Sequence, residues 1–180
     1  RRLELSAAWQ GWFGGEGTLF TTEMLGIQLL RLLVALIIIG ALYAVGYRRR
    51  EFFLAKGDLR APAEGVRWLG IDRGTPWTRL GGALALFVSL GTLAFLVFAG
   101  RPPWSAALGV LPLLPMVVIL AAMNAFSEEI TYRASLLAPL EGVVGGPQGL
   151  LLTATFFGVG HYYGVPYGVV GVLMAGFLGW

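Results

Sequence analysis

The chain of 180 residues contains no cysteine and few charged side chains. The lack of cysteine excludes disulfide bonds and thiolate metal sites. Asp, Glu, Lys and Arg make up only 13% of the residues, whereas a soluble domain carries about 25%. So few charges cannot cover a water-facing surface, and 57% of the residues are hydrophobic, with a mean hydropathy of +0.74. The composition therefore predicts an all-α fold, a polytopic transmembrane helical bundle.

Long apolar runs indicate how the chain is organised. Residues 1–22 combine tryptophan and phenylalanine with a few charges, and we expect an interfacial N-terminal segment there. Residues 23–180 are expected to form a multi-pass membrane domain. Its predicted spans lie at roughly 23–47, 80–99, 106–139, 150–163 and 167–180. The third run is longer than a bilayer is thick, so we expect it to tilt, to bend at Pro112 or Pro115, or to emerge on the cytoplasmic side.

A polar loop at 48–79 separates the first two predicted spans. It carries eight Arg or Lys and four Asp or Glu, so the positive-inside rule places it in the cytoplasm. Arg31, which lies within the first span, is expected to extend its guanidinium toward the membrane surface. We expect a plasma-membrane protein of a bacterium, with lipid headgroups near this loop.

The stretch SEEITYR at 127–133 interrupts the third apolar run with three ionisable side chains. Each charged residue costs at least about 2.5 kcal/mol to insert at the centre of a membrane helix, so such residues indicate a functional site. Residues four apart share one face of a helix. This spacing predicts an ion pair between Glu129 and Arg133. It also places Asn124 on the same face as Glu128.

The chain has a single histidine, His161, and its depth in the membrane can be estimated. It lies about 17 residues after a turn expected near 143–145, and the two glutamates lie about 15 residues before that turn. In antiparallel neighbouring helices these side chains reach similar heights, and Phe157 stacks on the same face as His161. Taken alone, the Glu–Arg pair fits a structural clasp and the histidine fits a packing residue. Their matching depth favours a site.

Two carboxylates and an imidazole in a buried pocket can carry out acid–base chemistry. A carboxylate close to a histidine can take a proton from water. The activated water can then attack an amide carbonyl, which is peptide hydrolysis, and neither serine nor cysteine is needed as a nucleophile. The residues alone therefore favour a hydrolase.

Two short motifs carry a resemblance to a known family. NAFSEEITYRASLL, 124–137, contains the pattern Glu-Glu-x-x-x-Arg, and FGVGH, 157–161, contains Phe-x-x-x-His. In this order and on consecutive spans, they resemble the CAAX protease and bacteriocin-processing family over a motif-bearing core at about 106–180. The resemblance implies an intramembrane glutamic endopeptidase. Eukaryotic members of that family remove the last three residues from prenylated CAAX proteins.

The resemblance also implies a role for each matching residue. Glu128 and His161 would activate the water, Glu129 would support the site through hydrogen bonds, and Arg133 would brace the glutamates. The family's third motif, His-x-x-x-Asn, forms an oxyanion hole and does not occur in these 180 residues. We favour a fragment whose remainder carries it over a member without full activity. We expect the 180 residues alone to be poorly active, because an oxyanion donor is worth about 10²–10³ in rate.

Two alternatives of other classes stay open at this stage. A metal-dependent hydrolase could use Glu128, Glu129 and His161 as ligands, although adjacent helical side chains point about 100° apart. A non-catalytic membrane scaffold or bacteriocin self-immunity protein could keep the same fold. For the protease, we expect a hydrophobic or lipidated peptide as substrate and membrane lipids as partners. We expect no nucleic acid, no metal and no cofactor, and the sequence sets no oligomeric state.

Overall fold

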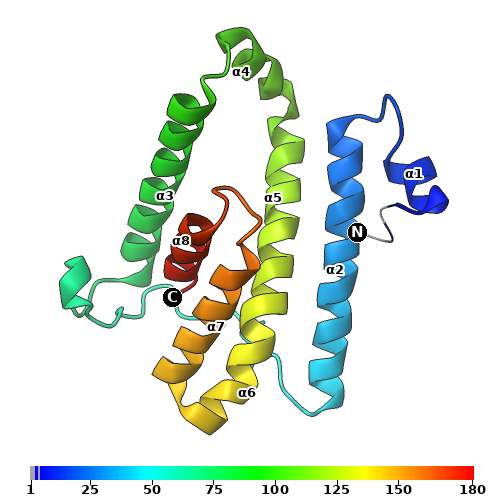
Figure 1. Cartoon of the computed structure of the whole chain (residues 1–180). Coiled ribbons are helices and arrows are strands. Elements are labelled where there is room, and N and C mark those ends of the chain that lie inside the picture. The colour runs from blue at the N-terminus through cyan, green and yellow to red at the C-terminus, as the bar shows by residue number, and fades with distance from the viewer. Residues whose placement is uncertain (1–2, 4) are drawn as a thin grey trace. The chain divides into compact units, whose positions relative to one another are not determined.

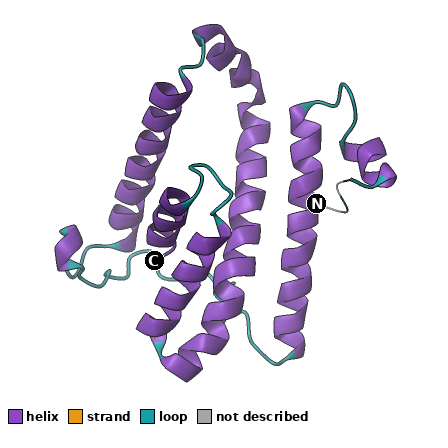
Figure 2. Ribbon diagram, in the orientation of Figure 1, coloured by secondary structure: helices purple, strands orange, loops and turns teal. Residues whose placement is uncertain are grey.

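The computed structural model describes residue 3 and residues 5–180. Over these residues the chain forms helices joined by loops, and no strand is present among them (Figure 2). Two compact units can be distinguished, one made of the described residues up to 55 together with residues 113–180, the other of residues 56–112. The all-α fold predicted from composition is confirmed.

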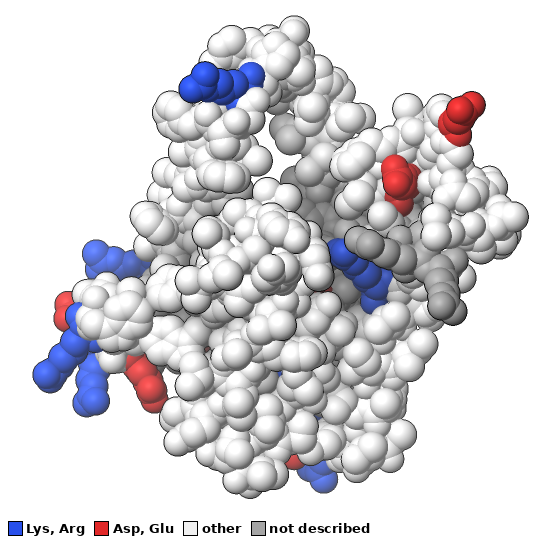
Figure 3. Space-filling view, viewed as in Figure 1, with Lys and Arg blue, Asp and Glu red and all other residues white. Residues whose placement is uncertain are grey.

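Among the described residues, three helical stretches are long and apolar enough to cross a membrane. They are Phe20–Ala44, Trp77–Gly100 and Trp104–Val144. The first three predicted spans agree with them to within a few residues. Charged side chains are sparse on the face of the molecule seen in Figure 3, as lipid-facing helices require. The chain is therefore a membrane protein with several spans.

The first unit contains the elements that form the site. In chain order they are α1 (Ala7–Phe13), α2 (Phe20–Ala44), α5 (Leu114–Glu128), the π-helical turn η3 (Glu129–Ala134), α6 (Ser135–Val144), α7 (Gly146–Gly160) and α8 (Val169–Gly179). Helix α2 packs along α5 and η3, α6 and α7 form an antiparallel hairpin, and α8 packs along α7 (Figure 1). The hairpin turns at Gly145, whose φ of 86° favours glycine. The turn expected near 143–145 is thus present.

A small apolar core joins α2 to the helices that follow it. Ala35 of α2, Phe52 of the next loop, and Ile130 and Ala134 of η3 are all buried in one cluster. The ring of Tyr43 meets the ring of Phe52 edge-on, with centroids 5.2 Å apart. These contacts fix α2 against η3, which brings the first predicted span next to the SEEITYR segment.

The second unit holds the second predicted span and most of the polar loop. Its elements are the 3₁₀ turn η1 (Arg67–Leu69), α3 (Trp77–Gly100) and α4 (Trp104–Val110). Helix α3 has no buried residue, as suits a helix surrounded by lipid. Between α4 and α5, the 3₁₀ turn η2 (Leu111–Leu113) interrupts the long apolar run. It contains Pro112, which cannot donate the backbone hydrogen bond of an α-helix, so the break lies at one of the two expected prolines.

Small residues let α7 and α8 approach closely. A Cβ atom added to Gly158 would lie 2.5 Å from the carbonyl oxygen of Val172 and 3.0 Å from Cα of Gly176. Ala154, Gly158, Gly171, Ala175 and Gly179 are all buried. Such small residues replace bulky packing where two membrane helices touch. This contact fixes the C-terminal end of α7, where His161 lies.

Helices α7 and α8 are each too short to cross a bilayer, and a loop at 161–168 connects them. They contain 15 and 11 residues, fewer than the ~20 that cross a bilayer. The predicted span at 150–163 therefore ends early, at Gly160, and His161 caps the helix instead of lying within it. Non-helical backbone at membrane depth is tolerated where it is buried in protein or lines a water-filled cavity. Tyr163 and Gly164 of this loop line the pocket described below.

Candidate active site

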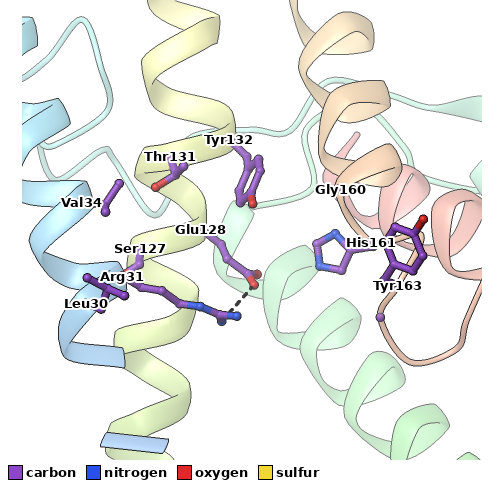
Figure 4. Close-up of a pocket in the computed structure, with 11 residues that line it drawn as sticks. Leu30, Arg31, Val34, Ser127, Glu128, Thr131, Tyr132, Gly160, His161 and Tyr163 are labelled. Atoms are coloured by element: carbon purple, nitrogen blue, oxygen red, sulfur yellow. Dashed lines mark ion pairs between the residues drawn. The ribbon is translucent and has the colours of Figure 1, made fainter. Parts of the chain in front are cut away.

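A pocket of about 520 Å³ lies within the first unit (Figure 4). Several elements supply its walls. Arg31 comes from α2, Ser127 and Glu128 from α5, Tyr132 from η3, and His161 and Tyr163 from the end of α7 and the loop after it. Sequence positions separated by about 130 residues thus meet around one cavity. Its acidic, basic and imidazole groups all face the same space.

Glu128 is the last residue of α5 and directs its carboxylate into the pocket (Figure 4). The Glu128 side chain is 26% exposed. Its Oε1 atom lies 4.0 Å from Nη1 of Arg31, which reaches across from α2. On the other side of the carboxylate, the imidazole of His161 faces it. No direct hydrogen bond joins Glu128 to His161 among the described residues, and both side chains line the same pocket.

The imidazole of His161 is held by the helix that precedes it. Its Nδ1 lies 2.8 Å from the carbonyl oxygen of Phe157, one helical turn earlier. A carbonyl oxygen can only accept, so Nδ1 carries a proton, and in the neutral form of the ring Nε2 is then an acceptor. The ring of Phe157 lies 4.4 Å from the imidazole, as the spacing of four residues predicts. The backbone thus selects the tautomer that can accept a hydrogen bond in the pocket.

A π-helical turn follows Glu128 directly. In η3 the backbone N–H of Ser135 bonds to the carbonyl oxygen of Ile130, five residues earlier, as well as to that of Arg133. Such turns contain one residue more than an α-helical turn and are frequent at functional sites. The wide turn still leaves Ile130 and Ala134 buried against α2. Hydrophobic periodicity gave no signal for it, because the apolar run reads as a continuous α-helix.

Glu129 does not take part in the pocket, contrary to the expectation that both glutamates would meet His161. Its side chain is 48% exposed and its Oε1 lies 3.4 Å from Nε of Arg133. The Arg133 nitrogen is buried and makes no hydrogen bond of good geometry, so the contact is electrostatic. The predicted ion pair between Glu129 and Arg133 is therefore present. Adjacent residues of a helix point in different directions, so Glu129 points away from the pocket that Glu128 faces.

Arg31 is the residue of the site that the sequence interpretation missed. It was expected to reach the membrane surface, but it lines the pocket and pairs with Glu128. Its Nη1 also donates a hydrogen bond to Oδ1 of Asn124, one turn before Glu128 on the same face. Asn124 itself does not line the pocket. The signal that could have found Arg31 was the presence of a lone charge within an apolar span, which by itself indicates a function.

Two further polar side chains shape the pocket wall. Ser127 is 2% exposed, and its hydroxyl has no hydrogen-bond partner among the described residues. Tyr132 packs its ring against Phe156 and Phe157, with centroids 5.7 Å and 5.9 Å away. This aromatic contact connects η3 to α7, and so connects the glutamate-bearing segment to the helix that carries His161.

The described side chains do not form a metal site. Among them, no group of three or more His, Asp or Glu is arranged to hold an ion. Glu129 faces Arg133 and not the pocket, which leaves Glu128 and His161 without a third ligand from this set. The ligand set considered for a metal-dependent hydrolase is thus not brought together.

A comparison with models of protein families gives a match to part of the chain. Residues 110–180 match the family model described as type II CAAX prenyl endopeptidase Rce1-like. The matched segment begins just before α5 and includes η3, α6, α7 and α8. No curated protein and no solved structure matches the chain. The family resemblance drawn from the two motifs is confirmed for this segment, which is less than half of the chain.

Proposed function

We propose that this protein, whose residues 110–180 match the Rce1-like type II CAAX prenyl endopeptidase family, is an intramembrane glutamic endopeptidase. One observation supports the chemistry above all others. The Glu128 carboxylate and the His161 imidazole face each other across a pocket inside the helical bundle (Figure 4). A general base and a hydrogen-bond acceptor on opposite sides of one space are the groups that can hold and deprotonate a water molecule.

The proposed reaction is the hydrolysis of one peptide bond. Water binds between Glu128 and Nε2 of His161, which accepts a hydrogen bond from it. Glu128 takes a proton as the water oxygen adds to the carbonyl carbon of the substrate. When the tetrahedral intermediate collapses, the C–N bond breaks and the same proton passes to the leaving amine. The carboxylate and the imidazole end the cycle as they began it.

The surroundings of the pocket favour a substrate from the membrane. Its walls belong to apolar helices, and exposed rings such as Tyr163 stand at the loop that follows His161. A hydrophobic or lipidated peptide can enter from the lipid or from the cytoplasmic side. The basic residues at 48–79 favour a cytoplasmic position for this loop. We further propose that the protein lies in the plasma membrane of a bacterium.

Cleavage of defined peptides tests this function. The protein is expressed from its complete gene, purified in detergent and incubated with two internally quenched peptides. One is farnesylated and ends in a CAAX sequence, and the other has the same sequence without the farnesyl group. Glu128→Gln and His161→Asn should each lower the rate by about 10²–10⁴-fold, as expected for lost acid–base catalysis.

The matched control is Arg49→Gln, which removes an exposed charge in the loop after α2. It should leave the rate unchanged. If Glu128→Gln cleaves either peptide at the wild-type rate, the assignment of the base is wrong. If the wild-type protein cleaves neither peptide, a peptidase acting on such substrates is excluded.

A further inference from the structure

Each of the two adjacent glutamates has its own arginine, and the two arginines come from different elements. Glu129 pairs with Arg133 within the same π-helical turn, outside the pocket. Glu128 faces Arg31, which lies on α2, and both residues line the pocket (Figure 4). The residues matched by the family begin at position 110, so Arg31 lies outside them. A charge from a separate helix is therefore directed at the carboxylate proposed to act as the base.

Global stability does not explain this contact. The side chain of Arg31 is 49% exposed and that of Glu128 is 26% exposed, and ion pairs of this kind contribute little to folding. Arg31 nevertheless lies well inside the apolar helix Phe20–Ala44, where a charge is unfavourable without a local use. Because Arg31 meets Glu128 within the pocket, its charge acts on the site and not on the stability of the whole fold.

The geometry of the guanidinium suits a residue that orients another. Arg31 donates a hydrogen bond to Asn124, one turn before Glu128 on α5, while the same nitrogen lies near Glu128. The bond to Asn124 fixes the planar group, and the fixed group then faces the carboxylate. A lysine would supply the same charge without the rigid fork of donors.

We propose that Arg31 is a positioning residue that holds the Glu128 carboxylate toward His161. It acts through Glu128 and does not bind the substrate. Because this role presupposes the proteolysis proposed above, its test needs one measurement that depends on turnover and another that does not.

The turnover measurement separates kcat from KM with the two quenched peptides. Arg31→Gln should lower kcat at least ten-fold and leave KM within two-fold of the wild type. Arg31→Lys should recover part of kcat, because the charge is kept and the second donor is lost. Arg49→Gln serves as the control for loss of an exposed arginine and should change neither constant. A raised KM with an unchanged kcat would show that Arg31 binds substrate and would overturn the positioning role.

Binding of uncleaved peptide gives a second separation of these roles. In the Glu128→Gln background, adding Arg31→Gln should leave the Kd of the farnesylated peptide unchanged, because the residue through which Arg31 acts has already been removed. A Kd that rises several-fold in the double variant contradicts the proposal.

The contact itself can be tested without catalysis. Arg31→Glu places a second carboxylate beside Glu128 and should lower the thermal unfolding temperature, as Glu128→Arg should beside Arg31. The double exchange, Arg31→Glu with Glu128→Arg, should remove the like-charge repulsion and raise the unfolding temperature above that of either single variant. If the wild-type protein cleaves no peptide, the proposed function fails, and this exchange still decides about Arg31. An unfolding temperature no higher than that of the single variants shows that the two side chains do not interact.

Discussion

Replacement of Gly158 by alanine tests how closely α7 and α8 are packed. The new Cβ would lie 2.5 Å from the carbonyl oxygen of Val172 and 3.0 Å from Cα of Gly176. Both atoms belong to the backbone of α8, so no side chain can rotate away. Helix α8 would have to move by several tenths of an ångström or more to reach a normal contact.

The expected loss of stability follows from this overlap. Overpacking of a tight contact costs about 1–3 kcal/mol. For a chain of this size, each kcal/mol lowers the unfolding temperature by about 2–4 °C, so we expect a fall of about 2–12 °C. The carbonyl oxygen of His161 would lie 3.0 Å from a Cβ atom added to Gly171 of α8, so a shift of α8 also disturbs the histidine. A misplacement of 1 Å in an active site can lower the rate by about 10²-fold.

Far-UV circular dichroism during heating in detergent measures the fall in unfolding temperature. Cleavage of the quenched peptides measures the loss of rate. The matched control is Gly142→Ala on α6, because a Cβ atom there meets nothing within 4 Å. Alanine favours a helix over glycine by up to about 1 kcal/mol, so this control should be neutral or slightly more stable. The packing argument is refuted if Gly158→Ala unfolds at the same temperature as Gly142→Ala and keeps its activity.

Three other predictions concern the pocket. Glu129→Gln should lower the cleavage rate far less than Glu128→Gln, because Glu129 pairs with Arg133 outside the pocket; equal losses in a peptide assay would contradict this. Ser127→Ala should leave the unfolding temperature unchanged or raise it, because the buried hydroxyl has no partner among the described residues to lose. A clear fall on heating would reveal a hydrogen bond to Ser127. Chelators such as EDTA and phenanthroline should leave cleavage unchanged, since the described side chains do not converge as a three-ligand group, and inhibition reversed by added zinc would oppose this mechanism.

Local patterns in the sequence predicted several parts of the site correctly. The ion pair between Glu129 and Arg133 and the contact of Phe157 with His161 both join residues four apart on one helix. Such contacts depend only on the period of the helix, which the sequence displays. The common depth of Glu128 and His161 also follows from counting residues on both sides of one turn.

Contacts between distant helices were not predictable in this way. The hydrogen bond from Arg31 to Asn124 joins residues 93 positions apart, and no periodicity relates them. The π-helical turn after Glu128 was also not predictable, because the spacing of its residues is equally compatible with a continuous α-helix. The orientation of the Glu129 side chain depends on this turn, which also carries its ion-pair partner Arg133.

By itself, the sequence determined that this protein crosses a membrane as a set of helices. The bilayer acts on each segment separately, so the length and composition of an apolar run are sufficient to predict a span. The helix period left open which of the two glutamates faces His161 and which arginine faces Glu128. The family resemblance implied Glu128 for the first, and the tertiary structure decided both. Those choices depend on how α2, η3 and α7 pack against one another, and the packing arises from shapes and small residues spread over the whole chain.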